Sequence, residues 1–378
     1  MAIAERPRTR FRLAAQVGRV PSMVVALDRD QELRFERLMD TLVMVDLHEH
    51  PQVLTENMDD LLDYFRSREY AWGYDAVRAG GWTTVCTANV LSGTGFASEG
   101  SYVDFSDLTT EIALMLADLA WQGDGVRKVC HADDVLAAKQ HGAIGFLPSV
   151  EHLAMGPHLY RIDVLYGMGI RLAGLTYTRK TFVGDGQFER TDCGLSDLGI
   201  AAVERMNDLG MVVDLSHAGT RTALEAIEHS QVPVVFSHNA ARAIWPTNRT
   251  RGDEELLACA QKGGLIGVTA VPNSLSDDPA QDISCVLDHY DYLVKLVGVD
   301  HVAIGTDTLV GDHVGFHKVA MGRDMAGRQF PAAYLNGLES PADGKNIIRG
   351  LIARGYSDEH IRKIAGQNAL DLLRRVVS

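Results

Sequence analysis

Closely spaced cysteines are missing from this 378-residue sequence. Its five cysteines stand far apart and no C-x-x-C pair occurs, so the sequence favours neither a disulfide framework nor a zinc ribbon. Scattered thiols are typical of a reducing compartment, and we expect a cytoplasmic location. No apolar run approaches the length of a transmembrane helix, and none follows the basic N-terminus as it would in a secretory signal. We therefore expect no membrane partner.

Positive charge is also scarce. The chain has 36 Lys and Arg residues against 50 Asp and Glu residues, a formal net charge of -14, which argues against a nucleic-acid partner. Its composition, 46% hydrophobic and 23% charged, is that of an ordinary globular protein. No linker rich in Pro, Gly or Ser divides the chain, and no internal repeat is visible. We expect residues 1–40 to form an N-terminal arm and residues 41–378 to form a single domain.

Apolar, β-branched segments recur along the chain and predict eight strands, with helical patterns between several of them. The strands are expected at residues 42–50, 82–90, 143–150, 170–176, 211–215, 232–237, 265–271 and 302–305. Helices are expected at residues 108–121, 196–209, 220–228, 253–262 and 284–297. Strands that alternate with helices pair in parallel, and eight of them match a (β/α)8 barrel of the TIM type. A doubly wound open sheet is the competing architecture, but no G-x-G-x-x-G follows a strand.

Two stretches interrupt this alternation of strands and helices. Residues 53–81 and 309–343 both follow strand ends, so we expect them to be insertions over the mouth of the barrel. His313 and His317, in the second stretch, have the spacing of one helical face. We interpret them as loop residues near the site and not as further metal ligands.

A histidine pair ends the first strand. In a strand, alternate side chains point the same way, so His48 and His50 are expected to face one metal ion. On these two residues alone, a polar strand end that holds two histidines by chance explains the pattern as well. The other strand ends decide the question, because they also carry groups that bind metals: Glu151, His152, Asp214, His217, His238 and Asp307.

Functional residues of a barrel lie where its strands end, so these groups are expected to converge. Two neighbouring metal ions share a bridging carboxylate, for which Glu151 is the natural candidate. Asp307 could accept a proton from water and return it to a leaving group. Arg249 could bind a substrate carboxylate or a developing oxyanion, although a surface ion pair explains it equally well. His152 and Asp214 could orient the metal ligands, or could simply be polar residues at strand ends without a role in the site.

Several segments, in this order, resemble the membrane (renal) dipeptidases, peptidase family M19 of the amidohydrolase superfamily. The resemblance extends from about Val43 to the C-terminus. Residues 45–51 resemble the family's D-G-H-N-D-L-P, residues 149–152 its V-E-G-G, and residues 174–177 its L-T-H element. Other matches are residues 193–199 with G-L-S/T-x-x-G, 213–217 with D-x-S-H, 233–238 with P-x-x-x-S-H, 305–307 with G-G-D, and 354–369 with the closing R-G-Y-S segment.

The resemblance implies a hydrolase with two divalent metal ions, zinc being expected, that cleaves dipeptides with a metal-activated water. It places one ion at His48 and His50 and the second at His217 and His238, with Glu151 bridging. It implies that Asp307 transfers the proton and that Arg249 binds the substrate carboxylate. The family often forms dimers, so the resemblance also implies a possible homodimer.

Two residues depart from the family pattern. His50 stands where the family has aspartate, so a neutral imidazole replaces an anionic ligand and the site carries one more unit of positive charge. Tyr177 stands where the family's L-T-H has histidine; its phenol can donate a hydrogen bond to an oxyanion but cannot carry positive charge. Dipeptides, including those with a D-residue on the C-terminal side, are the expected substrates. A non-peptide amide, a lactone or an N-acyl amino acid is the alternative, and a catalytically inactive barrel used as a binding subunit is a third hypothesis.

Overall fold

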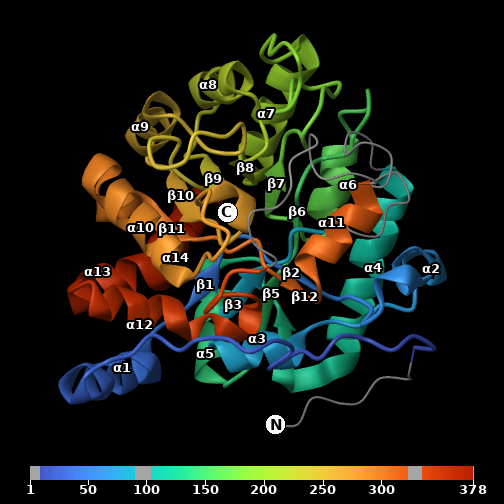
Figure 1. The fold of residues 1–378 in the computed structure, drawn as a ribbon. Helices are drawn as coiled ribbons and strands as arrows, with labels where there is room; N and C mark the ends of the chain where they lie inside the picture. Colours follow the sequence, from blue (N-terminus) through green and yellow to red (C-terminus); the bar gives the residue numbers. More distant parts are fainter. Residues whose placement is uncertain (1–8, 90–103, 322–333, 378) are drawn as a thin grey trace.

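The computed structural model describes residues 9–89, 104–321 and 334–377, and the fold is given for these (Figure 1). The strands are β1 Val45–Asp46, β2 His50–Val53, β3 Thr84–Cys86, β4 Val126–Lys128, β5 Ile144–Leu147, β6 Ser149–Val150, β7 Leu172–Gly174, β8 Val212–Asp214, β9 Val235–Asn239, β10 Leu265–Val268, β11 Val302–Ile304 and β12 Leu309–Val310.

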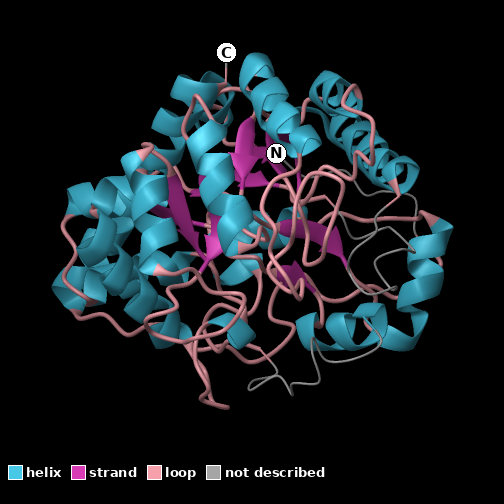
Figure 2. Ribbon diagram, turned by 90° about the horizontal axis from the view of Figure 1, so that it is seen from above, coloured by secondary structure: helices cyan, strands magenta, loops and turns pink. Residues whose placement is uncertain are grey.

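The helices surround these strands (Figure 2). They are α1 Arg29–Thr41, α2 Leu61–Ser67, α3 Tyr74–Gly80, α4 Phe105–Gln122, α5 Ala132–Gln140, α6 Arg161–Met168, α7 Asp197–Leu209, α8 Thr220–His229, α9 Asp253–Gln261, α10 Ile283–Val297, α11 His313–Met321, α12 Lys345–Ala353, α13 Asp358–Arg362 and α14 Asn368–Val376. None of the helices in the described ranges is long and apolar enough to cross a membrane.

The strands form a closed parallel barrel. Hydrogen bonding links them in the order β4-β5-β3-β1-β11-β10-β9-β8-β7-β6. Only Pro148 separates β5 from β6, and Asn89, beyond β3, forms a parallel bridge with Val150 of β6. The sheet therefore returns on itself, with β5 and β6 acting as one barrel strand. The predicted (β/α)8 barrel is confirmed, and the doubly wound alternative is excluded.

Sequence patterns mark the helices well. Ser196 caps the start of α7, where its side chain accepts a hydrogen bond from the Gly199 backbone N–H. Gly210, with φ of 72°, ends the same helix in the left-handed conformation that glycine adopts without strain. The prediction missed β4, which pairs with β5 outside the barrel. Its sequence, Val126–Lys128, contains two cations and no apolar run, so it lacks the signal of a buried strand.

The C-terminal helix closes one end of the barrel. Leu370 and Leu373 of α14 lie in one apolar cluster with the first residues of three strands, Val212, Val235 and Leu265. These strand residues mark the N-terminal face, so α14 covers the face opposite to the strand ends that carry the polar residues. The site therefore opens on the other face, as in other barrels of this type.

The described parts of both predicted insertions contain secondary structure of their own. Residues 53–81 include α2 and α3, and β2 pairs with β12 in a small parallel sheet. The interpretation of His313 and His317 as loop residues is wrong, because both lie on α11 and their rings stack 4.7 Å apart. Part of the 309–343 stretch, residues 322–333, lies outside the described residues. In the predicted N-terminal arm, α1 packs on α12 through a face that buries Leu38.

Two glycines allow the barrel strands to approach closely beside the site. A Cβ atom on Gly267 would lie 1.9 Å from the Ser237 carbonyl oxygen, and one on Gly305 would lie 1.6 Å from the same atom. Any side chain at either position would displace the end of β9. The glycines thus place Ser237 and the adjacent His238 deep in the barrel.

Candidate metal centre

Five side chains of types that can bind metals converge with Asp307 near the C-terminal ends of the strands. β1 is shorter than predicted and ends at Asp46, and His50 is the first residue of β2. The alternation argument for His48 and His50 is therefore wrong, because the backbone between them is not one continuous strand. The two imidazoles nevertheless meet, since each Nε2 atom lies 3.9 Å from an oxygen of Glu151.

Glu151 lies at the centre of this group. Its Oε1 atom is 2.7 Å from Nε2 of His217, and His217 Nε2 is 3.1 Å from Nε2 of His238. One oxygen of Glu151 faces His217, and the other faces His50. Burial raises the pKa of Glu151 to about 8, although the charges of His50 and Arg249 act in the opposite direction. Without bound cations this carboxyl therefore favours its protonated form.

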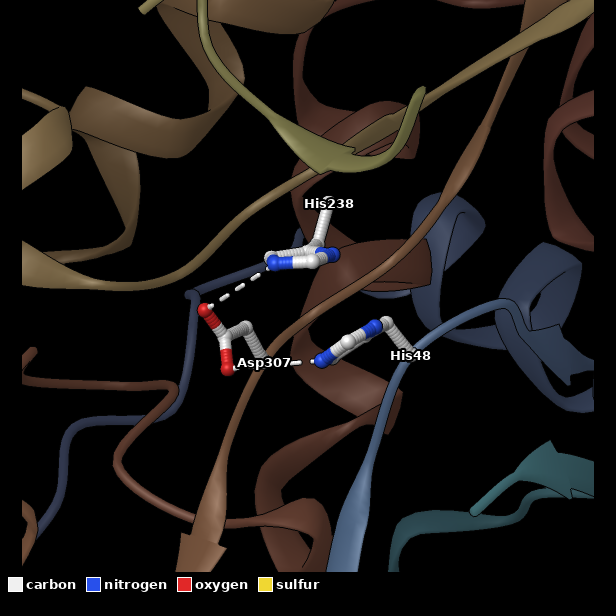
Figure 3. A group of neighbouring side chains, drawn as sticks. All are labelled: His48, His238 and Asp307. Atoms are coloured by element: carbon white, nitrogen blue, oxygen red, sulfur yellow. Dashed lines mark ion pairs between the residues drawn. The ribbon is translucent and has the colours of Figure 1, made fainter. Parts of the chain in front are cut away.

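Asp307 lies across the site from Glu151. The imidazoles of His48 and His238 each point Nε2 at its carboxylate, at 3.8 Å (Figure 3). His50 is closer, with Nε2 3.2 Å from Oδ1. The backbone of Asp307 is left-handed, with φ of 57°, a conformation that aspartate tolerates better than most residues. Burial alone would raise the pKa of Asp307, but the hydrogen bond from His50 and nearby positive charge hold it below its ordinary value.

A hydrogen-bond chain fixes the proton positions on two of the imidazoles. The Ser237 hydroxyl donates to Asp214, so its oxygen is left to accept hydrogen bonds. His238 Nδ1 lies 2.8 Å from that oxygen, and His48 Nδ1 lies 3.2 Å from it. Both rings therefore carry hydrogen on Nδ1 and present a bare Nε2 lone pair to the centre of the site. This contact gives Asp214 the orienting role that the sequence suggested, exerted through Ser237.

The donor set fits divalent cations. Three groups have ligand atoms within 4.8 Å of one another: His48, His50 and Glu151; Glu151, His217 and His238; and His48, His238 and Asp307. The first two groups share Glu151, as a bridging carboxylate requires. Burial lowers the pKa of His48, His217 and His238 well below the ordinary value, which keeps these imidazoles neutral. His48 Nε2 is buried and has no hydrogen-bond partner among the described residues, as expected of an atom reserved for a cation.

The remaining predicted residues surround this centre. Arg249 is 5% exposed, so the surface ion pair is excluded. Its Nη1 donates to the Ser216 carbonyl oxygen, and its Nη2 lies 3.6 Å from Oδ2 of Asp307. The ring of Tyr177 lies against His217, with centroids 4.4 Å apart. Burial raises the pKa of this phenol well above its ordinary value, so Tyr177 remains a neutral hydrogen-bond donor.

One residue, Gln187, contacts His217 but was missed in the sequence analysis. Gln187 lies in the irregular segment between β7 and α7, where no pattern marks it. Its Nε2 is 3.1 Å from His217 Nδ1, and its Oε1 accepts a hydrogen bond from Arg251. If His217 binds a cation through Nε2, its hydrogen must move to Nδ1, and a rotated Gln187 amide would accept it through Oε1. Arg251 would lose one hydrogen bond, to Gln187, but would keep its hydrogen bonds to three backbone carbonyl groups.

This contact leads to the prediction that Gln187 sets the metal affinity of the site. We expect Gln187→Leu to weaken zinc binding by about 10–100-fold, the range typical of residues that orient a ligand. Gln187→Glu should restore it, because a carboxylate also accepts hydrogen from Nδ1. Competition with a chelator measures both affinities. The exposed Gln231→Leu is the control, and an unaltered affinity in Gln187→Leu would rule out the orienting role.

A family model described as "Membrane dipeptidase (Peptidase family M19)" matches residues 32–314. Dipeptidase tcpJ of Claviceps purpurea is 27% identical over 285 residues, 74% of this chain and 62% of that protein. Human Dipeptidase 3 is 28% identical over 366 residues, 91% of this chain and 67% of that protein. For mouse Dipeptidase 3 the match is 30% over 217 residues, 56% of this chain and 40% of that protein. The chain thus spans two-fifths to two-thirds of the length of these relatives.

Solved structures share the fold. The crystal structure of an amidohydrolase from Pseudomonas aeruginosa superposes with a TM-score of 0.75 at 26% identity, over 90% of this chain and 98% of that one. A metallo peptidase from Rhodobacter sphaeroides, liganded with a phosphinate mimic of the dipeptide L-Ala-D-Ala, gives a TM-score of 0.70 at 19% identity, over 89% of this chain and 99% of that one. The architecture of this chain therefore recurs in an amidohydrolase and in a metallo peptidase.

Proposed function

Because the chain belongs to the membrane dipeptidase family, peptidase family M19, we propose that it is a metal-dependent hydrolase that cleaves the amide bond next to an amino acid with a free carboxylate. The observation that carries the proposal is the pair of ligand groups that share Glu151, with Asp307 facing both. Dipeptides are the substrate class that the family name gives. A D-residue on the carboxyl side is favoured by the ligand of the Rhodobacter sphaeroides peptidase.

His48, His50, Glu151, His217 and His238 would hold two ions, and we propose zinc because imidazole nitrogen and carboxylate oxygen suit it. Such ions, when bound, polarise a carbonyl group and lower the pKa of water.

The other residues act on the substrate. Tyr177, as a neutral donor, hydrogen-bonds the carbonyl oxygen as negative charge develops on it. Asp307, ionised in its resting state, accepts the proton of the attacking water and delivers it to the leaving nitrogen. Arg249 pairs with the substrate carboxylate through Nη2, which has no hydrogen-bond partner among the described residues.

The test compares a dipeptide with its C-terminal amide. We expect zinc-loaded protein to hydrolyse Ala-D-Ala and to lose about 100-fold in kcat/KM on the amidated form, because a charge-assisted hydrogen bond to Arg249 is lost. In Arg249→Met the two forms should react at similar low rates. Arg374→Met, on the opposite face of the barrel, is the control. Equal rates on both forms in the parent protein would refute the role of Arg249, and no hydrolysis of any amide would favour the inactive barrel.

A further inference from the structure

A cavity lies beside the Glu151 side of the metal centre, where it is lined by His152. It has a volume of about 560 Å³, within the range of small-molecule pockets. Its walls come mainly from the segment between β6 and α6 and from the segment that follows β7, two neighbouring connections of the barrel (Figure 1). Phe105, the first residue of α4, and Arg161, the first residue of α6, complete the lining. Most of the wall is apolar: Phe105, Leu153, Ala154, Met155, Pro157, Leu175, Phe182 and Val183. None of the candidate metal ligands is among its lining residues.

Contacts place the cavity on the Tyr177 side of the site. His152 lines the cavity and directly follows Glu151 in sequence. Its ring centroid is 6.1 Å from that of Tyr177, which in turn lies 4.4 Å from His217. Arg249 instead contacts Asp307. A substrate whose carboxylate meets Arg249 can therefore extend its acyl part past Tyr177 into the cavity.

His152 supplies one polar group in this apolar wall. Its Nδ1 accepts a hydrogen bond from the Ala154 backbone N–H at 3.1 Å, so the ring hydrogen is on Nε2. The residue is 3% exposed, and Nε2 has no partner in the described part of the chain. Because Nδ1 accepts this hydrogen bond and therefore carries no hydrogen, the ring is neutral. A neutral, unpartnered donor fits a carbonyl oxygen and disfavours an ammonium group.

The charged residues around the cavity also disfavour an ammonium group. The charged side chains that line it are cationic: Arg161 stacks on Phe105, and the exposed Lys180 pairs with Asp185 at 3.1 Å. None of the described lining residues is acidic. An ammonium group would therefore find no acidic partner among these lining residues and would lie near the Arg161 guanidinium, which is unfavourable. His50, in place of an anionic ligand, also reduces negative charge at the adjoining metal centre.

We propose that this cavity binds an uncharged apolar acyl group, so that the preferred substrates are N-acyl amino acids and not dipeptides with a free amino group. The proposal rests on the proposed function. Hydrolysis breaks the C–N bond, transfers the hydroxyl of water to the acyl carbon and a proton to nitrogen, and releases a carboxylic acid and an amino acid. His152 then hydrogen-bonds an acceptor on the acyl side.

A matched substrate series tests the chain-length preference. With zinc-loaded protein we expect kcat/KM to rise from acetyl-D-alanine to hexanoyl-D-alanine by about threefold to fourfold per methylene group while the cavity fills. Norleucyl-D-alanine has the same carbon chain plus an ammonium group, and its kcat/KM should be at least tenfold lower than that of hexanoyl-D-alanine. A flat series, or a preference for norleucyl-D-alanine, would overturn the proposal while leaving the hydrolase intact.

Variants of the lining residues test whether the chain-length preference arises in this cavity. Phe182, 60% exposed, forms part of its wall, and Phe182→Ala should reduce the hexanoyl preference, whereas Thr181→Trp should abolish it by filling the space. Trp121→Ala, an exposed aromatic on α4, is the control. Titration calorimetry of metal-free protein gives a readout independent of turnover. Hexanoyl-D-alanine should bind more tightly than acetyl-D-alanine, and this difference in affinity should be smaller in Thr181→Trp. If no amide is hydrolysed the proposed function fails, and equal binding of the two ligands would then refute the cavity as well.

Discussion

Replacing Asp307 by asparagine should lower kcat of the zinc-loaded protein by about 10³-fold while zinc remains bound. Removal of a group that transfers a proton costs 10²–10⁴-fold, roughly, and asparagine has the same shape without the basic oxygen. Asparagine also tolerates the left-handed backbone at this position, so the fold should persist. His48, His50 and His238 all point Nε2 at the Asp307 carboxylate, so it is well placed to hold a proton beside both ligand groups.

The measurement combines steady-state kinetics with elemental analysis of zinc in the same samples. Asp277→Asn, on an exposed residue remote in sequence from the ligands, provides the matched control. Turnover of Asp307→Asn within threefold of the parent would assign the proton transfer to another group. Loss of zinc in the variant would instead make Asp307 a ligand, as the third donor group allows.

The barrel and most of the site could be predicted because both depend on local patterns. Apolar runs mark strands in any sequence context, and parallel strands place their C-terminal ends on one face. Glu151, His217 and His238 follow or end such runs, so the sequence alone brings them together. The pairing of His48 with His50 was also predicted, but through an alternation that the short β1 does not have. Their convergence comes instead from the turn into β2 and the pairing of β2 with β12.

Features that depend on contacts between distant segments could not be predicted. Gln187 reaches His217 from an irregular segment, and no spacing rule relates the two. The burial of Arg249 depends on how the segment after β9 folds back over Ser216. The cavity beside His152 requires two connections whose sequences show no shared pattern. His313 and His317 have the spacing of one helical face but were interpreted as loop residues, and the structure places both on α11.

Replacing Glu151 by glutamine should make the metal-free protein more stable than the parent at alkaline pH. Folding raises the pKa of Glu151 from an ordinary 4.5 to about 8, chiefly through burial. The protonated group therefore favours the folded state below about pH 4.5, and this contribution is lost as pH rises through about 8. Glutamine remains neutral and can still donate toward His217. We expect Glu151→Gln to gain about 2–4 kcal/mol over the parent in free energy of unfolding at pH 8.5, and little at pH 4.5.

Zinc should reverse the order of stability, so that the parent becomes more stable than Glu151→Gln. Ions that bind only the folded state stabilise it, and their two ligand groups share Glu151. The parent should therefore gain stability and hold two equivalents of zinc, whereas Glu151→Gln should hold at most one and lose about 10³-fold in turnover. Urea unfolding with chelator and with zinc, at both pH values, compares the parent and the variant in all four conditions, and the exposed Glu204→Gln on α7 is the control. Equal stabilisation of parent and variant by zinc would contradict a bridging role. Burial of the ionised Glu151 carboxylate destabilises the metal-free protein, yet this residue belongs to both ligand groups. Cations bound in both groups would stabilise the ionised carboxylate, which explains an acidic side chain at this buried position.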